Sequence, residues 1–364
     1  MDGEFIKMYI YDIPERASYN IKDLFKNSED FSKYEYNTPA PEELPTFTLP
    51  QLYNLRGGEF TIDDKPVKYK VQVALYTVGG AYSIRIRVPI ENIDFQFLAR
   101  LSFDKNVVKE FDQAAEKVKK KVDAELEKQF SLSTSKISEV YGFYFINSTK
   151  SEALKAGKNV IPGLLIDEPN PQALDPSYME YVLSKSISYN ADDVFYVGWE
   201  GAVLIDKLKN FDYELLVAEI ANIQLLKLRV YKAKTSEILK KTSNAVAELD
   251  SMSFARRLFS NKAEKLNSEL GRFEDDLREM MNRIENTVFG MGEWYLSRLY
   301  NLFASAFRLN ELKESLIMDS ETIEKRKSFV EEIINAKRND ILELIIILLI
   351  FVEIVIEVVY LYFR

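Results

Sequence analysis

The stretch LELIIILLIFVEIVIEVVYLYFR, Leu342–Arg364, is a nearly unbroken run of apolar side chains. A helix of about 20 apolar residues crosses the hydrocarbon layer of a bilayer. Residues 341–363 supply about that number, so the sequence predicts a single C-terminal transmembrane helix there. The alternative is a buried helix of a soluble core.

Three carboxylates, Glu343, Glu353 and Glu357, interrupt this run. About 15 strongly apolar residues at roughly -0.3 to -0.6 kcal/mol each favour insertion by about 5–9 kcal/mol. Two central acidic residues oppose insertion by about 2.5–3.5 kcal/mol each if they cost as much as Asp. Insertion of a lone helix is therefore marginal, and its cost falls if the carboxylates are protonated or face a partner helix or water.

The spacing of the glutamates places them on one stripe. At about 100° per residue, Glu353 and Glu357 lie about 40° apart, and Glu343 lies within about 80° of Glu353. One span per chain offers no second helix of its own, so we expect a homo-oligomer whose spans meet along this stripe. In the alternative, the helix sits shallow and its glutamates reach the interface.

Basic residues gather before the apolar run, and one follows it. Positive-inside placement then predicts a single-pass membrane protein, tail-anchored, with residues 1–340 on the cytoplasmic side and membrane lipid as a partner. Lys337 and Arg338 would flank the membrane directly. The basic residues before the run are Lys325, Arg326, Lys327, Lys337 and Arg338, and Arg364 follows it.

The sequence predicts long, coiled-coil-like helices over residues 208–340. Apolar side chains recur at helical spacing over 213–248, 253–288 and 293–318. A further charged helix is expected from Ser320, with Ser320 or Thr322 as its cap, running without a stop signal into the apolar segment.

Residues 1–207 predict a mixed α/β domain, so the fold class is α+β. Two alternating runs flank Gly79-Gly80 and indicate a hairpin over 67–90, with Arg85 and Arg87 on one face and Ile84, Ile86 and Val88 on the other. The other expected elements are strands at 5–13, 141–147 and 193–206, a helix at 104–130 and a Pro/Gly/Asn-rich loop at 155–177.

Composition restricts the chemistry. The chain has no cysteine and no histidine, which excludes thiol catalysis, disulfides, Cys/His zinc sites and imidazole bases. We identify no catalytic residue, no cofactor-binding residue and no metal ligand, and expect no enzymatic activity. The net charge of -9 argues against direct nucleic-acid binding.

Two local charge patterns have ordinary interpretations. Four lysines among Asp and Glu, at 117 and 119–121, indicate a solvated helix face rather than a phosphate-binding patch. The pairs Asp192-Asp193 and Asp275-Asp276 indicate capping or solvent exposure rather than a cation site.

Two stretches resemble the family named required for meiotic nuclear division. NAKRNDILELIIILLIFVEIVIEVV, residues 335–359, is similar to that family's ending, with matches at Arg338, Leu342, Glu343, Glu353 and Glu357. FYVGWEGAVLI, residues 195–205, resembles its Glu-Gly-Ala-Val strand. The resemblance implies a membrane-anchored protein that forms higher assemblies and has no established enzymatic activity.

Two functions fit these expectations. The first is a membrane-anchored non-enzymatic scaffold, oligomerising through its helices and span, with an unknown protein partner bound by the cytoplasmic domain. The second is an oligomeric cation channel or transporter of CorA-like outline, lined by the glutamates. The Gly-Met-Asn pore signature of that family is absent, and the nearest match is Gly290-Met291-Gly292.

Overall fold

The structure is a computed structural model of the whole chain. It describes residues 1–14, 21, 24–26, 28–34, 49–62, 64–77, 79–131, 134–207, 210–251, 260–289 and 294–363. Two features of the sequence, the Gly290–Gly292 segment and Arg364, lie outside these residues.

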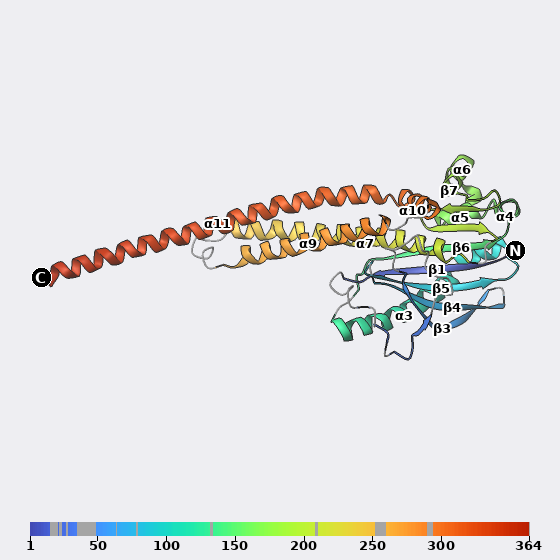
Figure 1. Cartoon of the computed structure of the whole chain (residues 1–364), viewed down its shortest axis with the longest axis horizontal. Coiled ribbons are helices and arrows are strands. Elements are labelled where there is room, and N and C mark those ends of the chain that lie inside the picture. Colours follow the sequence, from blue (N-terminus) through green and yellow to red (C-terminus); the bar gives the residue numbers. More distant parts are fainter. Residues whose placement is uncertain are drawn as a thin grey trace. The chain divides into compact units, whose positions relative to one another are not determined.

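The chain forms two compact units. The first comprises Met1–Val230 with Met280–Lys313, and the second comprises Tyr231–Glu279 with Glu314–Arg364. The domain boundary predicted after residue 207 therefore falls inside the first unit. The fold class is α+β, as the sequence predicts: a mixed sheet, then helices, and a long apolar C-terminal helix (Figure 1).

A nine-stranded sheet dominates the described part of the first unit, in the order β2-β3-β4-β5-β1-β6-β9-β8-β7. Neighbouring strands pair antiparallel except β6 and β9, which are parallel. The strands are β1 (Asp2–Asp12), β2 (Ser32–Tyr34), β3 (Gln51–Ile62), β4 (Lys65–Tyr76), β5 (Ala81–Ile90), β6 (Ser138–Asn147), β7 (Ser186–Ile187), β8 (Val194–Val197) and β9 (Gly201–Asp206).

The predicted hairpin is confirmed as β4 and β5, which pair from Lys70 opposite Arg87 to Tyr76 opposite Ala81. Gly80 has a φ of 58°, in the left-handed region that glycine adopts without a steric penalty. The predicted alternation is also confirmed, because Ile84, Ile86 and Val88 lie in the core while Arg85 faces the other side of the sheet.

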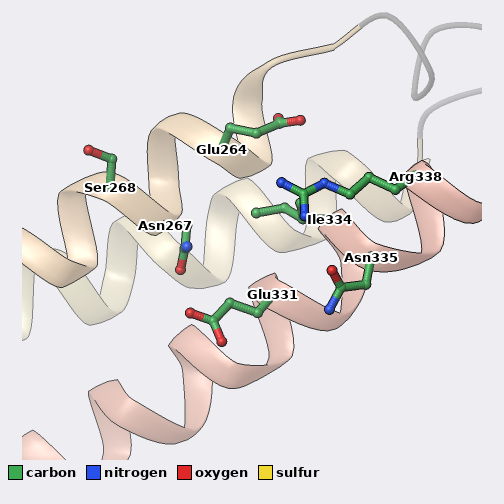
Figure 2. A pocket seen from close by; sticks show the side chains of 7 residues that line it. All are labelled: Glu264, Asn267, Ser268, Glu331, Ile334, Asn335 and Arg338. Atoms are coloured by element: carbon green, nitrogen blue, oxygen red, sulfur yellow. The ribbon is translucent and has the colours of Figure 1, made fainter.

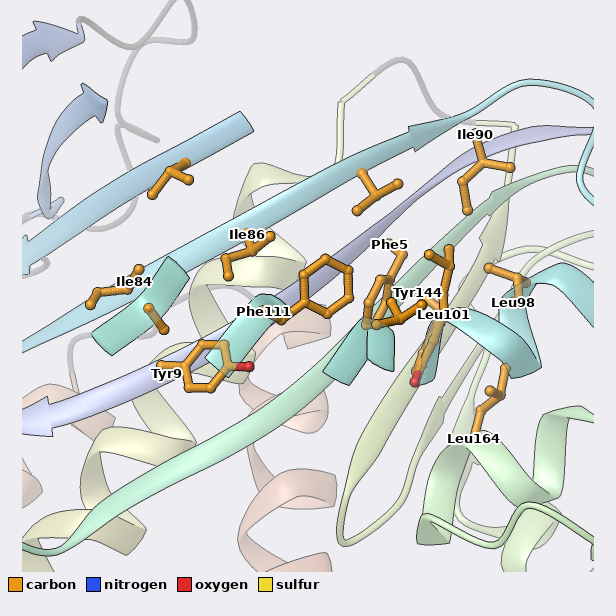
Figure 3. Packing of buried hydrophobic residues seen from close by; sticks show 14 of the residues in the cluster. Phe5, Tyr9, Ile84, Ile86, Ile90, Leu98, Leu101, Phe111, Tyr144 and Leu164 are labelled. Atoms are coloured by element: carbon orange, nitrogen blue, oxygen red, sulfur yellow. The ribbon is translucent and has the colours of Figure 1, made fainter. Parts of the chain in front are cut away.

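Two helices cover one face of the sheet, α2 (Phe95–Phe103) and α3 (Lys105–Phe130). Asp104 begins α3 by accepting hydrogen bonds from the backbone N–H groups of Asn106 and Val107. Phe111 of α3 packs against Phe5 of β1, with ring centroids 6.0 Å apart (Figure 3). The helix predicted over 104–130 is thus confirmed, and its apolar stripe closes the core.

Helix α7 (Asp212–Ser251) covers the opposite face with its first half and is joined to the sheet by buried ion pairs. Arg85 of β5 donates to both carboxylate oxygens of Glu219, at 2.9 and 2.5 Å, and to Gln72 at 2.8 Å. The two charged side chains are 3% and 0% exposed. Lys227 forms a second buried pair with Asp12, at 2.6 Å.

Two expectations about residues 150–206 are wrong. The expected strand over 193–206 is a hairpin of β8 and β9, because the backbone reverses at Gly198, whose N–H donates to the carbonyl of Gly201. The expected loop over 155–177 contains short helices instead. They are α4 (Lys150–Gly157), α5 (Ile161–Ile166), a 3₁₀ turn at Pro171–Ala173 and the start of α6 (Pro176–Ser184).

Helix α10 (Trp294–Ala306) also belongs to the first unit. It presents Phe303 to the rings of Tyr141 and Phe195, with centroids 6.1 and 5.9 Å away. The helix predicted over 293–318 is divided, because Arg308 has a φ of 53° and separates α10 from α11 (Leu309–Tyr362). Ser320 and Thr322 lie inside α11, so they do not cap a helix.

Three helical segments make up the second unit: the second half of α7, most of α9 (Lys262–Phe289) and α11 from Glu314. Side chains buried on α9 alternate at spacings of three and four residues, which is the pattern of a helix packed along one stripe. Ion pairs join the segments, including Lys241 with Glu269 and Lys327 with Glu274. The buried stripe of α9 is Ala263, Leu266, Leu270, Phe273 and Leu277.

Replacing Arg85 by Met should lower the free energy of unfolding of the first unit by about 3–5 kcal/mol, because Glu219 keeps a buried charge without its partner. The double variant Arg85→Met/Glu219→Leu should recover most of this loss. Denaturant titration followed by tryptophan fluorescence measures it, since Trp199 and Trp294, the two tryptophans, both lie in this unit. A loss below about 1 kcal/mol in Arg85→Met would show that the pair is not a stability determinant.

Candidate membrane anchor and adjoining pocket

The end of α11 is apolar and uncovered. Within the described residues, α11 is the one helix long and apolar enough to cross a membrane, and none of its most apolar window is buried. All side chains from Ile341 to Phe363 are exposed. Exposure of this much apolar surface to water is unfavourable, so this segment is consistent with a membrane anchor.

The three glutamates of the apolar run all lie on this helix. α11 continues without interruption from Leu309 to Tyr362, so the helical spacing that places Glu343, Glu353 and Glu357 on one stripe applies. Their side chains are exposed. Their role as contacts between copies stays a prediction.

Lys337 is not a free surface charge. Its ammonium donates to the carbonyl oxygen of Ser260 at 2.6 Å and to Oε1 of Glu264 at 2.8 Å, and its side chain is only 10% exposed. It therefore joins α11 to the start of α9, four residues before Ile341. Its neighbour Arg338 is exposed, and the flanking of a membrane by this pair stays a prediction.

A pocket of about 410 Å³ lies beside this contact, between α9 and α11. Figure 2 shows residues of α9 on one side and of α11 on the other. The lining is mainly polar and includes both signs of charge. It consists of Glu264, Asn267 and Ser268 from α9 and Glu331, Ile334, Asn335 and Arg338 from α11.

Several polar groups of the pocket lack a partner among the described residues. Oε2 of Glu264 and Oδ1 of Asn267 have almost no accessible surface and no hydrogen-bond partner in that part of the chain. Glu331 and Arg338 form no ion pair with another described residue. The two oxygens are too enclosed to meet a ligand in the pocket, whereas the exposed side chains of Glu331 and Arg338 can.

The first unit contains a separate group of perturbed ionisable side chains around Lys7. Burial lowers the pKa of the Lys7 amine, against the opposing effect of Asp167, Asp112 and Glu200. Burial likewise raises the pKa of Glu200, and the Asp167 charge adds to this effect. Structural networks shift pKa values in the same way as reactive sites, so these shifts do not by themselves indicate catalysis.

The other charged patterns take ordinary roles. Lys119 pairs with Asp123 and Lys121 with Asp30, as a mixed-charge helix face predicts. Asp193 accepts the backbone N–H groups of Tyr189 and Asn190, which is a turn cap. Across the described ranges, no group of three or more Asp or Glu side chains is placed to hold a metal ion.

Comparison with known proteins assigns the sheet-containing part of the chain. The profile of a family described as "Uncharacterized protein MJ0711, N-terminal domain" matches residues 2–212, which is more than half of the chain and ends where α7 begins. The chain belongs to this family. No solved structure gives a significant match.

One curated relative is an uncharacterised protein, MJ0711, of Methanocaldococcus jannaschii. It is 23% identical over 210 residues, which are 57% of this chain and 60% of the relative. The chain thus matches less than two thirds of that protein's length. These comparisons do not bear on the resemblance to the family required for meiotic nuclear division, which stays a prediction.

Sequence reasoning identified Arg338 but missed the rest of the pocket. Its residues come from two helices more than sixty positions apart in the chain, and each is an ordinary polar residue on a charged helix. The available signal was weak: Glu331 and Arg338 are seven residues apart and therefore share one side of α11.

Replacing Lys337 by Met should destabilise the packing of α9 on α11 by about 1–3 kcal/mol, because the Ser260 carbonyl and the Glu264 carboxylate lose their shared donor. Hydrogen exchange at the amides of residues 261–266 should be faster than in the parent protein. The matched control is Lys325→Met, which removes an exposed lysine of the same helix. Equal exchange in both variants would show that Lys337 does not hold these helices together.

Proposed function

We propose that this protein is a membrane-anchored, non-enzymatic scaffold whose copies assemble through the C-terminal span. The observation that carries the proposal is α11, a single helix that is packed in the bundle up to about residue 337 and fully exposed beyond Ile341. A helix of this kind changes solvent along its length, from protein interior to lipid.

The glutamates support the assembly. A carboxylate in hydrocarbon is costly unless it is protonated, hydrogen-bonded or paired. In the described part of the chain no second helix could supply such a partner within the bilayer. The simplest partner for Glu353 and Glu357 is therefore the same stripe of another copy, where a protonated carboxyl can donate to its neighbour.

The helices before the span support the same proposal. Buried positions on α11 recur every seven residues, at Leu316, Ile323, Val330 and Lys337. A seven-residue repeat is the periodicity of coiled-coil packing. We infer that this coiled-coil-like region takes part in the assembly together with the span.

The first unit offers a surface for a protein partner. Tyr181, Tyr189 and Trp294 are 57%, 65% and 59% exposed, although large aromatic side chains are usually covered. The ring of Tyr189 contacts that of Tyr295 on α10, 5.5 Å away, so part of this surface is built jointly by the β7 edge and α10. Exposed aromatic side chains are typical of protein interfaces.

The side of the membrane on which residues 1–340 lie is inferred from charge alone and is part of the proposal. Basic residues before the span outnumber the single arginine after it, so positive-inside placement puts residues 1–340 in the cytoplasm. The resemblance to the family required for meiotic nuclear division implies the same outline, with a membrane anchor and higher assemblies.

Crosslinking of the whole protein in native-like membranes tests the assembly. We expect discrete oligomers for the parent chain and a shift toward monomer for Glu353→Leu/Glu357→Leu, because the carboxyl contacts between copies are lost. Glu321→Leu, an exposed position of α11 outside the apolar segment, is the control and should assemble normally. A strictly monomeric parent protein, or an unchanged pattern in the double variant, contradicts the proposal.

The same stripe also fits the second hypothesis, an oligomeric ion pathway in which a ring of glutamates selects cations. Cation flux into proteoliposomes that Glu353→Gln abolishes would favour this function over the scaffold. A flat flux trace for the parent protein excludes it.

A further inference from the structure

The pocket between α9 and α11 lies at the depth of lipid headgroups if α11 spans the membrane, and the inference rests on that proposed anchor. Arg338 is three residues before Ile341, which is about 4.5 Å along the helix axis. The polar layer of a bilayer extends about 5–8 Å beyond the hydrocarbon core on each side. The Arg338 end of the pocket therefore reaches the level of headgroup phosphates.

Two charged side chains of the pocket that form no ion pair with a described residue have opposite signs and are separated along α11. Arg338 is at the end nearest the apolar segment, and Glu331 is seven residues earlier on the same side of α11, about 10.5 Å away along the axis. Neither is neutralised by an ion pair with a described residue, because the nearby Lys337 ammonium is held by Glu264. A ligand between them is favoured if it carries an anion toward the membrane and a cation away from it.

The Glu331 carboxylate specifies the cationic part of the ligand. Two further oxygens of the lining residues (Figure 2), Oε2 of Glu264 and Oδ1 of Asn267, have almost no accessible surface and take no part in binding. A primary ammonium has three N–H donors and can hydrogen-bond to the Glu331 carboxylate. A quaternary ammonium has none, and would contact it by charge alone.

The anionic part of the ligand matches the side chain of Arg338. A guanidinium binds phosphate through two parallel hydrogen bonds, and Arg338 has no competing carboxylate within 4.0 Å among the described residues. Inorganic phosphate alone would satisfy Arg338 but leave the Glu331 carboxylate without a cation. The site therefore favours phosphate and ammonium in one molecule.

We propose that this pocket binds the headgroup of a phospholipid that carries a phosphate and a primary ammonium. The phosphate contacts Arg338, and the ammonium contacts Glu331. The lipid tails then lie along the start of the apolar segment.

Native mass spectrometry of the whole protein released from nanodiscs tests the proposal. The nanodiscs contain phosphatidylcholine with a minor share of either phosphatidylethanolamine or phosphatidylglycerol. We expect retained phosphatidylethanolamine on the parent protein, and about tenfold weaker retention for Arg338→Gln, because a charge-assisted contact is lost. Lys325→Gln is the control with the same charge change and should retain the lipid normally.

A second pair of variants tests the ammonium contact. Glu331→Gln should remove the preference for phosphatidylethanolamine over phosphatidylglycerol, whereas Glu332→Gln, an exposed neighbour outside the pocket, should keep it. Soluble O-phosphoethanolamine and inorganic phosphate are then added to the parent protein as competitors. Their effect on lipid retention shows whether the ligand is a lipid or a free anion.

Three outcomes overturn the inference. The first is equal retention by Arg338→Gln and Lys325→Gln in protein that inserts and assembles normally, which leaves the scaffold proposal intact. The second is displacement of the lipid by millimolar inorganic phosphate, which would make the ligand a free anion. The third is failure of the parent protein to insert into nanodiscs, which contradicts the anchor as well.

Discussion

One uninterrupted helix, α11, is packed against other helices along its first part and exposed along its apolar end, and the proposed anchor depends on that continuity. Its first part buries Leu316, Ile323 and Val330 against other helices of its unit, whereas its last 23 side chains before Arg364 are exposed and almost wholly apolar. Backbone hydrogen bonds continue within the helix across this change, so no polar group of the main chain is left for lipid to solvate. An unbroken helix of this kind can therefore connect a packed bundle to a bilayer.

In the sheet-containing unit, buried ion pairs attach the long helix α7 to one face of the sheet. Arg85 and Glu219 are both removed from water, and their bidentate contact, with Gln72 and Tyr76 as further partners, replaces the lost hydration. Lys227 and Asp12 repeat the arrangement farther along α7. Buried ionic contacts of this kind accept few alternative registers, so they fix which residues of α7 face the sheet.

Regular periodicity made much of the fold predictable from sequence. The repeat of apolar residues over a short stretch of sequence predicts local structure. It predicts the hairpin at Gly79-Gly80, the helix over 104–130 and the continuity of the last helix. The wrong predictions fall where the local sequence gives little sign that the chain reverses or a helix ends. Residues 193–206 read as one strand because apolar runs lie on both sides of the reversal, which only Gly198 and Gly201 mark, and the break at Arg308 has no glycine or proline at all.

The pocket was beyond prediction because it depends on tertiary packing. Lys337 looked like one more membrane-flanking cation, yet its contacts with Ser260 and Glu264 depend on how α9 meets α11. The unpaired oxygen of Asn267 likewise becomes apparent only once neighbouring side chains exclude water from it. By contrast, the stripe of Glu343, Glu353 and Glu357 needs only helical spacing and was accessible from sequence.

Alkaline extraction of membranes from cells that make the full chain tests whether residues 341–363 reside in a bilayer. Peripheral proteins are released by this treatment, whereas a protein with a spanning helix stays with the lipid. We expect the whole protein to remain in the membrane pellet. Recovery of the intact chain in the soluble fraction, with the side chains of residues 341–363 protected inside its own fold, would contradict it.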